Sequence, residues 1–372
     1  MGLSRHPSQV GRRWIVAAMA FALALGAAAA LAPGGFRPRL DRAGDDPARQ
    51  LHRLALTYLP PVQIPAPPST TEHKARIELG RRLYFEPALS VNRSVSCNTC
   101  HPLDHFGAGV GDVNGAVGDG CNVCHLMDQF GMDGKPTSPG HDGRSGGRNT
   151  PSVYNAALHV AQFWDGRAAT LEEQAGMSIL DPLEMGMPDR AAVEERLREA
   201  GTYADLFAAA FPGADAGMTF SNATRAIAAF EATLITPSRF DRYAAGDLDA
   251  LTPTELRGLS NFLELGCIPC HSGDSAGGKM YEPFGIFARY WDLTGSPVPD
   301  EGRARATGRA SDRHYFKVPS LRNVARTAPY FHDGSVEKLD DAVRIMGRAQ
   351  LGVILTDGQV EDLVAFLKTL GG

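Results

Sequence analysis

Hydrophobic residues recur at helical spacing in several segments of the chain, whereas strictly alternating segments are scarce. Leu79 and Leu83 lie one turn apart within residues 71–85, and a valine and a leucine repeat this spacing within residues 189–200. Because positions three or four residues apart share one face of a helix, both segments predict amphipathic helices. The same pattern predicts further helices over residues 203–211, 222–234 and 357–370, and from residue 252 towards residue 267.

Residues with strong positional preferences mark the ends of these helices. Ser221 is predicted to cap the segment 222–234, and Pro237 stops it. Pro253 lies at the first position of a helix, where its missing N–H is not needed. Between residues 107 and 147 glycine is dense and the periodicity disappears, so loops are expected there. The fold class is therefore predicted to be mainly α with extensive loops.

The first 32 residues combine a basic start with a long apolar stretch. Arg5, Arg12 and Arg13 precede residues 14–32, which are almost all apolar. This arrangement is typical of a secretory signal peptide, but 19 such residues are also long enough for an uncleaved membrane anchor. Residues 1–32 are therefore predicted to be a signal peptide or an N-terminal anchor.

Proline dominates the end of the segment that follows. Five of the nine residues from 60 to 68 are prolines, which favours an extended backbone over a helix. Residues 33–70 are accordingly predicted to form a Pro-rich linker.

The charge balance excludes one large class of function. The formal net charge is −5, and removal of residues 1–32, which carry three arginines and no acidic residue, would change it to about −8. Nucleic-acid-binding domains are strongly basic, so no nucleic-acid partner is expected. The roughly 340 remaining residues are enough for two domains with their own cores.

All six cysteines of the chain lie in Cys-x-x-Cys-His pentads. This is the attachment signature of c-type haem, in which two thiols bond covalently to the porphyrin and the histidine ligates the iron. Three disulfides or a zinc site are the alternatives, but neither explains a histidine after every cysteine pair. The three pentads are Cys97, Cys100 and His101; Cys121, Cys124 and His125; and Cys267, Cys270 and His271.

Several stretches outside the pentads resemble the bacterial di-haem cytochrome c peroxidases. They lie between about residues 79 and 370, in family order, at 147–151, 161–167, 182–185, 230–237, 319–323, 327–334 and 342–346. The resemblance implies two cytochrome-c-like haem domains: an N-terminal peroxidatic domain (71–240) and a C-terminal electron-transfer domain (241–372). It also implies reduction of hydrogen peroxide to water, with electrons from a small cytochrome c or cupredoxin. A periplasmic location and two covalent haems belong to the same expectation, and many members of the family are homodimers.

The resemblance also assigns the iron ligands. His271 is implied as the proximal ligand of the C-terminal haem, with Met346 as the second axial ligand. A thioether opposite a histidine favours ferrous iron and raises the potential, which suits an electron-accepting haem. Without the resemblance, Met346 would be interpreted as filling of the hydrophobic core. In the N-terminal domain, His141 matches the distal histidine, which leaves the iron in many relatives so that peroxide can bind.

Three further roles are implied by the resemblance. Glu184 matches the acid/base that moves a proton between the two peroxide oxygens, and its place in an apolar stretch favours a raised pKa. Trp164 matches the tryptophan between the two haems. A calcium site between the domains is implied at Asn149 and the backbone carbonyls of Thr327 and Pro329, because Ca²⁺ prefers oxygen ligands.

The chain departs from the family in having two pentads in its N-terminal domain. Residues from 97 to 107 recur from 121 to 131 at a constant offset of 24, which indicates a tandem duplication. The sequence alone slightly favours the second copy, with Cys121, Cys124 and His125, because its distance to His141 resembles that of the family. The other copy would hold a third haem, form a disulfide or remain unused.

Two other functions are compatible with the pentads. Related di-haem proteins oxidise a protein-bound residue during cofactor biogenesis, but they carry a tyrosine where this chain has Met346. A plain electron-transfer cytochrome is the second alternative. It would need neither Glu184 nor a mobile His141.

Overall fold

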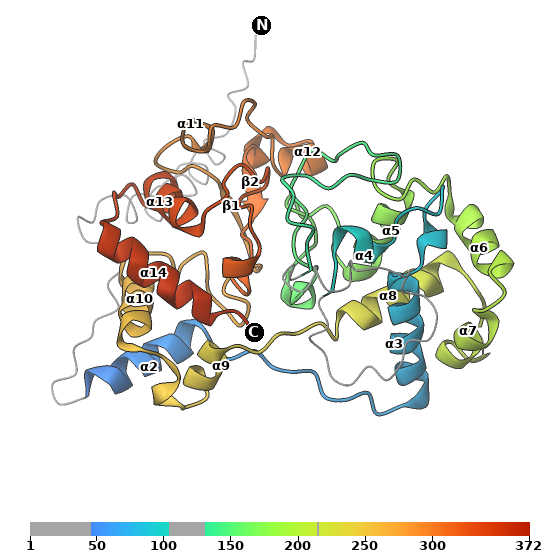
Figure 1. The fold of residues 1–372 in the computed structure, drawn as a ribbon, viewed down its shortest axis with the longest axis horizontal. Helices are drawn as coiled ribbons and strands as arrows, with labels where there is room; N and C mark the ends of the chain where they lie inside the picture. The colour runs from blue at the N-terminus through green and yellow to red at the C-terminus, as the bar shows by residue number, and fades with distance from the viewer. Residues whose placement is uncertain (1–45, 104–130, 214–215) are drawn as a thin grey trace, which may run out of the picture.

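The protein consists of two helical lobes that lie side by side (Figure 1). The computed structural model describes residues 46–103, 131–213 and 216–372. Its α-helices are α2 (Pro47–Tyr58), α3 (Thr71–Tyr84), α4 (Cys97–Cys100), α5 (Leu171–Leu180), α6 (Arg190–Glu199), α7 (Ala204–Ala210), α8 (Phe220–Glu231), α9 (Arg239–Ala244), α10 (Pro253–Glu264), α11 (Tyr290–Thr294), α12 (Ala304–Thr307), α13 (Leu339–Gln350) and α14 (Asp357–Thr369). Within these described ranges, the sheet structure is one antiparallel pair, β1 (Tyr281–Pro283) and β2 (Tyr315–Lys317). The prediction of a mainly α fold is therefore confirmed.

The N-terminal lobe, with α3 to α8, is built around α3 and α8. Both helices bury one face, so Leu79, Leu83 and Ile227 are completely buried in a core that also receives side chains from α5, α6 and α7. Thr70 caps α3 by accepting a hydrogen bond from the backbone N–H of His73 at 3.1 Å. This lobe carries α4 and the loops that approach the other lobe.

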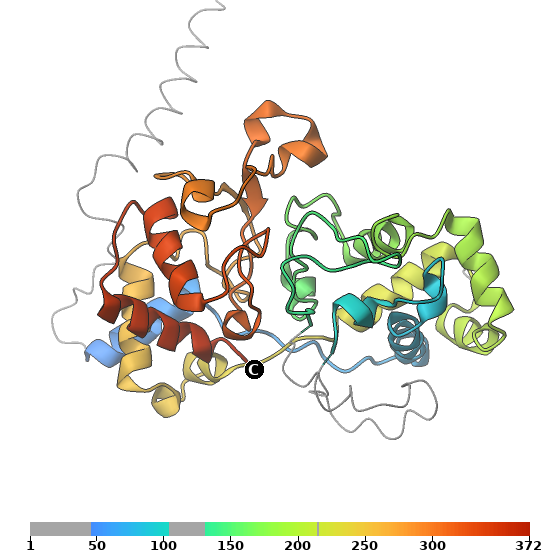
Figure 2. The ribbon, with the colours of Figure 1, turned by 45° about the horizontal axis from the view of Figure 1, so that its top comes forward.

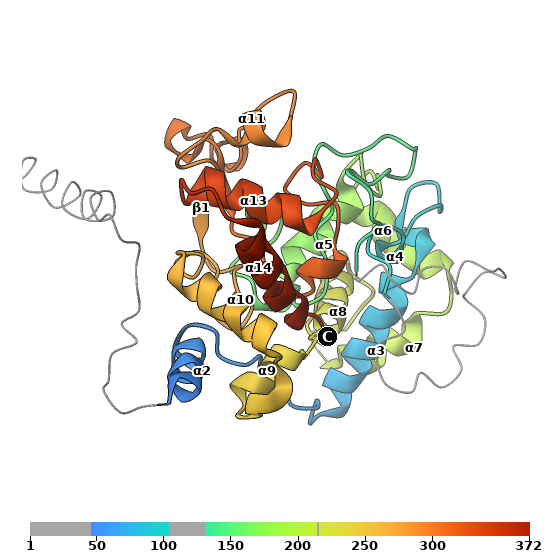
Figure 3. The same ribbon diagram turned by 60° about the vertical axis from the view of Figure 1, so that its left-hand side comes forward.

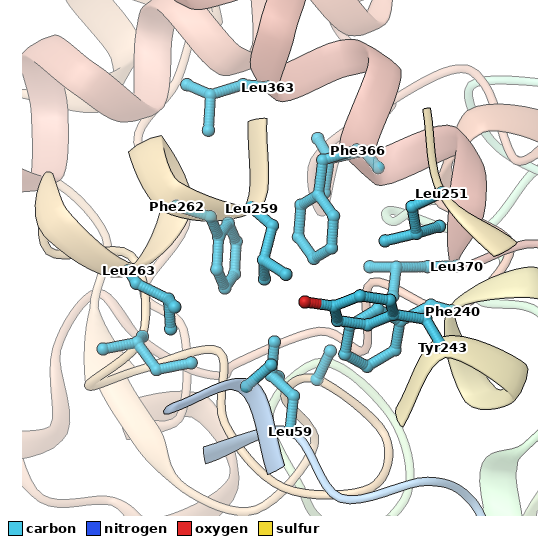
Figure 4. Close-up of a cluster of buried hydrophobic side chains, with 14 of the residues drawn as sticks. Leu59, Phe240, Tyr243, Leu251, Leu259, Phe262, Leu263, Leu363, Phe366 and Leu370 are labelled. Carbon is cyan, nitrogen blue, oxygen red and sulfur yellow. The ribbon is translucent and has the colours of Figure 1, made fainter. Parts of the chain in front are cut away.

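The C-terminal lobe holds α2 and all elements from α9 onward (Figure 3). Its largest core joins α10 and α14 with α2 and α9, and Figure 4 shows Phe262 and Phe366 at its centre. Their ring centroids are 5.2 Å apart, and Phe240 meets Phe366 edge-on at 5.7 Å. Burial of each such side chain stabilises the fold by about 1.5–3 kcal/mol.

A glycine lets the two main helices cross closely in each lobe. A Cβ atom on Gly80 of α3 would lie 1.8 Å from the carbonyl oxygen of Ala226 in α8. A Cβ atom on Gly258 of α10 would lie 1.9 Å from the carbonyl oxygen of Asp362 in α14. Phe230 and Phe366 lie four residues after these carbonyls and contact the respective glycine. Each lobe thus has the same helix crossing, which supports two cytochrome-c-like units.

Within the part of the chain that the structure describes, the backbone passes between the lobes twice (Figure 2). One crossing is the proline-rich stretch at 60–69, which lies in no helix or strand. The predicted linker 33–70 nevertheless contains α2, because Ala55 and Leu59 bury themselves in the C-terminal core at 0% and 1% exposure. The second crossing lies between α8 and Ser238, which caps α9. The lobes therefore divide close to the predicted boundary at 240, although α9 belongs to the C-terminal lobe.

Two sequence-based expectations about the helices need correction. The helix predicted over 222–234 begins earlier, at Phe220, because Thr219 and not Ser221 accepts the capping hydrogen bond from Asn222 at 3.1 Å. Helices α5 and α13 were not predicted, although α13 carries Met346. Residues 1–32 lie outside the described residues. Within the described ranges, no helix combines the length and apolar character needed to cross a bilayer.

Candidate functional site

The pentads at 97–101 and 267–271 share one backbone hydrogen bond. The N–H of His101 donates to the carbonyl oxygen of Cys97 at 2.9 Å, and the N–H of His271 donates to that of Cys267 at 3.0 Å. This single turn places both thiols and the imidazole of each pentad close together. No disulfide joins the four cysteines of these two pentads.

The imidazole rings of both pentads are oriented by backbone carbonyls. Nδ1 of His101 lies 3.2 Å from the carbonyl oxygen of Gly131, and Nδ1 of His271 lies 3.3 Å from that of Ala276. A ring nitrogen that faces a carbonyl carries the proton, so Nε2 keeps the lone pair that an iron ligand needs. Burial lowers the pKa of His271 to about 4 and also lowers that of His101, which keeps both rings neutral.

A cavity of about 420 Å³ in the C-terminal lobe brings the predicted ligands together. Cys267, Cys270, His271 and Met346 all line it, and Met346 reaches it from α13. Burial raises the pKa of Cys267 to about 12, so its thiol is not a thiolate. The wall is mostly apolar, as expected for the site of a large flat cofactor.

In the N-terminal lobe, the loop that carries His141 is joined to the loop that carries Glu184. The backbone N–H of His141 donates to the carbonyl oxygen of Glu184 at 2.8 Å. Gly140 permits this approach, because a Cβ atom there would lie 1.9 Å from the carbonyl oxygen of Leu183. A Cβ atom on Gly186 would lie 2.4 Å from Nε2 of His141. Gly140 is thus a point of close backbone contact.

The carboxyl group of Glu184 is partly withdrawn from solvent. Burial raises its pKa, the neighbouring charge of Asp181 acts in the same direction, and a hydrogen bond from Ser178 and the charge of Arg167 oppose it. Gln174 in turn donates to the Ser178 hydroxyl at 3.0 Å. Glu184 can therefore hold a proton at a higher pH than an ordinary glutamate.

The pentad at 97–101 lies next to these two loops. The thiol of Cys100 is 3.9 Å from the carbonyl oxygen of Pro139, two residues before His141. Burial and the charges of nearby acids, Glu184 among them, raise the pKa of Cys100 to about 11. Cys100, His141 and Glu184 thus belong to one region of the lobe. Cys121, Cys124 and His125 lie outside the described residues.

Trp164 occupies the seam between the lobes and lines the C-terminal cavity. Its Nε1–H donates to the carbonyl oxygen of Asn149 at 2.9 Å, and its own carbonyl accepts from the N–H of Lys317 in β2 at 2.8 Å. Both contacts fix the indole between an N-terminal loop and the C-terminal sheet.

Arg148 ties the two lobes together with buried ion pairs. It binds Asp165 of the N-terminal lobe at 2.7 Å and Asp300 of the C-terminal lobe at 2.8 Å. The pair with Arg148 holds the pKa of Asp300 at about 2. This network was not predicted, although Arg148 and Asp165 both lie in stretches that resemble the family. The sequence spacing does not show that they meet.

The residues implied as calcium ligands line the cavity at the seam between the lobes. Asn149, Thr327 and Pro329 line the same cavity, and the backbone N–H of Asn149 donates to the carbonyl oxygen of His332 at 2.7 Å. Their side-chain and carbonyl oxygens are of the kind that suits Ca²⁺. Within the described ranges, no group of three or more His, Cys, Asp or Glu residues could hold a metal ion.

Glu231 is a buried acid that the sequence analysis did not single out. It follows Phe230 in α8 and is 4% exposed, and its Oε2 has no hydrogen-bond partner among the described residues. In the C-terminal lobe, Phe366 occupies the position that matches Phe230, and the residue that follows it is Leu367, which lines the C-terminal cavity. Glu231 lies near Cys97, whose pKa its charge helps to raise. Burial raises the pKa of Glu231 to about 8.

We expect Glu231 to make stability depend on pH. Its pKa is higher in the folded than in the unfolded protein, so the folded state binds the extra proton between about pH 4.5 and pH 8. Stability should therefore fall as the pH rises through this window, by an amount on the order of 4 kcal/mol. Denaturant unfolding of Glu231→Gln at pH 5 and pH 8 should show a much smaller difference than the wild type. Equal pH dependence in both proteins would contradict this assignment.

The paired cysteines, the oriented histidines and the apolar cavity define a c-type cytochrome with two lobes. Residues 74–120 and 113–249 match the family described as di-haem cytochrome c peroxidase. The first match contains the pentad at 97–101, and the second contains the pentad at 121–125. Two overlapping matches with one pentad each are what a duplicated segment would produce. The chain belongs to this family, and its c-type haems accordingly number at least two.

Individual relatives agree with the family. The chain is 44% identical over 296 residues to a cytochrome c551 peroxidase of Pseudomonas aeruginosa, with 79% of this chain and 78% of the relative covered. It is 40% identical to a cytochrome c551 peroxidase of Nitrosomonas europaea, with 84% of each chain covered. The solved structure of a MauG-like protein associated with microbial copper homeostasis superposes with a TM-score of 0.66 at 30% identity, covering 84% of this chain and 93% of that one.

Proposed function

We propose that this protein reduces hydrogen peroxide to water in the periplasm, with two electrons from a small cytochrome c or cupredoxin. The observation that carries the proposal is the region in which Glu184, His141 and Cys100 meet. There a carboxyl group with a raised pKa lies beside a haem-attachment pentad. The relatives named cytochrome c551 peroxidase support the same reaction.

The residues of the N-terminal lobe can carry the proton chemistry. A haem attached there supplies iron that binds and reduces peroxide. Peroxide must lose a proton from the oxygen that meets the iron, and the departing oxygen must gain one. Glu184 takes the first proton and gives it to the second oxygen, which leaves as water. Two protons from solvent and the two electrons from the donor then complete the second water. His141 would be a ligand of the haem iron and would have to withdraw before peroxide could enter.

We infer that Cys97, Cys100 and His101 carry this reactive haem. Two contacts support this assignment. The thiol of Cys100 lies against the loop that carries His141, and a backbone carbonyl orients the ring of His101. The sequence-based preference for Cys121, Cys124 and His125 concerns residues outside the described ranges and remains an untested prediction. A third haem on that copy also stays open to test.

The C-terminal lobe is the proposed entry point for electrons. Cys267 and Cys270 would bond to the porphyrin, and His271 and Met346 would ligate the iron from opposite sides. Trp164 lies in the wall of this cavity and on the side of the other lobe, where it shortens the gap that an electron must cross. Calcium at Asn149, Thr327 and Pro329 would hold the same seam together.

Met346 separates this function from the main alternative. Similarity to a MauG-like structure alone would also allow oxidation of a protein-bound residue. The related enzymes with that activity carry a tyrosine as the second axial ligand, whereas this cavity presents a methionine. A plain electron-transfer protein would not need a raised pKa at Glu184.

One preparation tests these assignments together. The exported protein, purified from a host that attaches c-type haem, is digested and its haem-bearing peptides are identified by mass. The same sample is assayed for calcium content and for peroxide-dependent oxidation of reduced cytochrome c. We expect haem on the peptides that contain Cys97 and Cys267, about one calcium per chain and rapid turnover. Haem-loaded protein that consumes no peroxide would refute the proposed function, and protein without calcium would refute the calcium site.

A further inference from the structure

Two hydrogen-bond donors that come from different lobes lie side by side in the wall of the C-terminal cavity. Lys317, in β2, is 6% exposed, and its Nζ has as its hydrogen-bond partner Nδ1 of His159, at 3.4 Å. His159 comes from the N-terminal lobe, and its Nε2 is shielded from solvent without a partner in the described chain. Both residues line the cavity that contains His271.

The contact between these two side chains determines which nitrogen of His159 carries the proton. An ammonium group can only donate, so Nδ1 of His159 must be the acceptor. In the neutral imidazole the proton then lies on Nε2, which makes Nε2 a second donor. The cavity wall therefore presents an ammonium group and an N–H side by side.

Among the described residues, the ammonium group of Lys317 is hydrogen-bonded to His159 and is not paired with a carboxylate. In the strand register, Tyr281 and not Glu282 is paired with it. Burial lowers the pKa of Lys317 to about 8 and raises that of Glu282. Arg322, the other lysine or arginine in this wall, is bound to Asp241 by hydrogen bonds of 2.7 and 2.8 Å. A buried cation without a counter-charge is destabilising, so Lys317 fits a site that receives an anion.

The ring of His159 is held in place beside the pentad. A Cβ atom on Gly278 would lie 2.4 Å from this ring, and one on Gly277 would lie 3.2 Å from Nδ1 of His271. The backbone N–H of Val160 donates to the carbonyl oxygen of Gly278 at 2.8 Å. The same turn thus positions the proposed iron ligand and the donor from the opposite lobe.

We propose that His159 and Lys317 bind the propionate carboxylates of the C-terminal haem. Because His159 comes from the N-terminal lobe and Lys317 from the C-terminal lobe, the two side chains form a clamp across the seam between the lobes. The proposal rests on attachment of haem at Cys267 and Cys270. Haem is the covalent group of this cavity and carries two carboxylates, which the ammonium group and the N–H would receive. A cation bound to a propionate of this haem would stabilise the ferrous state of the iron, which carries one positive charge less.

The test is the reduction potential of the Met346-ligated haem in the holoenzyme, measured by spectroelectrochemistry. Lys317→Met should shift the ferrous-to-ferric ratio at fixed potential by about tenfold towards ferric, which corresponds to about 59 mV. His159→Phe should shift it in the same direction by a smaller factor. Lys317→Arg keeps the charge and should remain within about threefold of the wild type.

Lys279→Met is the matched control. Lys279 is close by, but its ammonium group donates to the carbonyl of Leu158 and pairs with Asp274 at 3.0 Å outside the cavity. Its substitution should leave the potential unchanged. An unchanged potential in Lys317→Met, with haem confirmed on the 267–271 peptide, would overturn the clamp. If that variant does not accumulate, a holoenzyme crystal structure decides: propionates beyond hydrogen-bond distance of both Nζ and Nε2 overturn the proposal.

Failure of the clamp and failure of the proposed function give different results. A protein that shows the shift in potential but reduces no peroxide would keep the clamp and lose the peroxidase assignment. A protein that reduces peroxide but shows no shift in potential would keep the peroxidase assignment and lose the clamp.

Discussion

Peroxide reduction should be abolished in a Cys97→Ala/Cys100→Ala variant, while its C-terminal haem remains attached. Without the two thiols the reactive haem has no covalent link, and His101 has no iron to ligate. The expected loss is at least 10³-fold in turnover, because the remaining haem would have both axial positions occupied. Turnover with reduced cytochrome c measures the loss, and haem-peptide mapping confirms that the 267–271 peptide is still loaded.

The matched control is the same double substitution in the second copy, Cys121→Ala/Cys124→Ala. It should retain peroxidase activity within a few-fold of the wild type if the first pentad is the reactive one. The reverse result, with activity lost only in the second variant, would restore the sequence-based preference for His125. Loss of activity in both variants would indicate that electrons or structure pass through a third haem.

The helical fold could be predicted from the sequence because its signals are local. Thr252 and Pro253 start α10 as expected, and residues 357–370 form α14 almost as predicted. The helix α2 was missed, although Asp46 caps it by accepting a hydrogen bond from the N–H of Ala48 and Pro47 lies at its start. The proline-rich stretch beside it signals an extended chain, whereas the burial of Ala55 depends on a core contributed by residues more than 180 positions later.

The residues of the proposed sites also fall into two groups: some were identified from local motifs, and others are brought together only by the fold. The pentads and Met346 were identified from motifs, and the structure places Met346 and the pentad at 267–271 around one cavity. The pairing of Lys317 with His159 could not be predicted, since it joins residues 158 positions apart in different lobes. The burial of Glu231 was likewise invisible, because an acid after a hydrophobic residue is ordinarily a solvated helix position.

Replacement of Glu184 by glutamine should reduce turnover by roughly 10²–10⁴ while leaving the haem spectra unchanged. Glutamine keeps the size and the hydrogen bonding of the side chain, but it cannot accept and return a proton. The backbone contact of Glu184 with His141 involves its carbonyl, which the substitution does not alter. A loss in turnover would therefore report proton transfer and not a displaced distal loop. Stopped-flow measurement of peroxide reduction by the half-reduced enzyme isolates this step from electron delivery.

The pH profile provides the decisive comparison. Because burial raises the pKa of Glu184, the wild type should show a limb in its pH–rate profile above the ordinary carboxylate range, and the glutamine variant should lack it. Glu172→Gln is the control, since Glu172 is an exposed carboxylate on α5, the helix that also carries Ser178, and should leave both rate and profile intact. If Glu184→Gln turned over at the wild-type rate with the same limb, the proton would have to travel by another group, and Glu184 would have no part in the reaction.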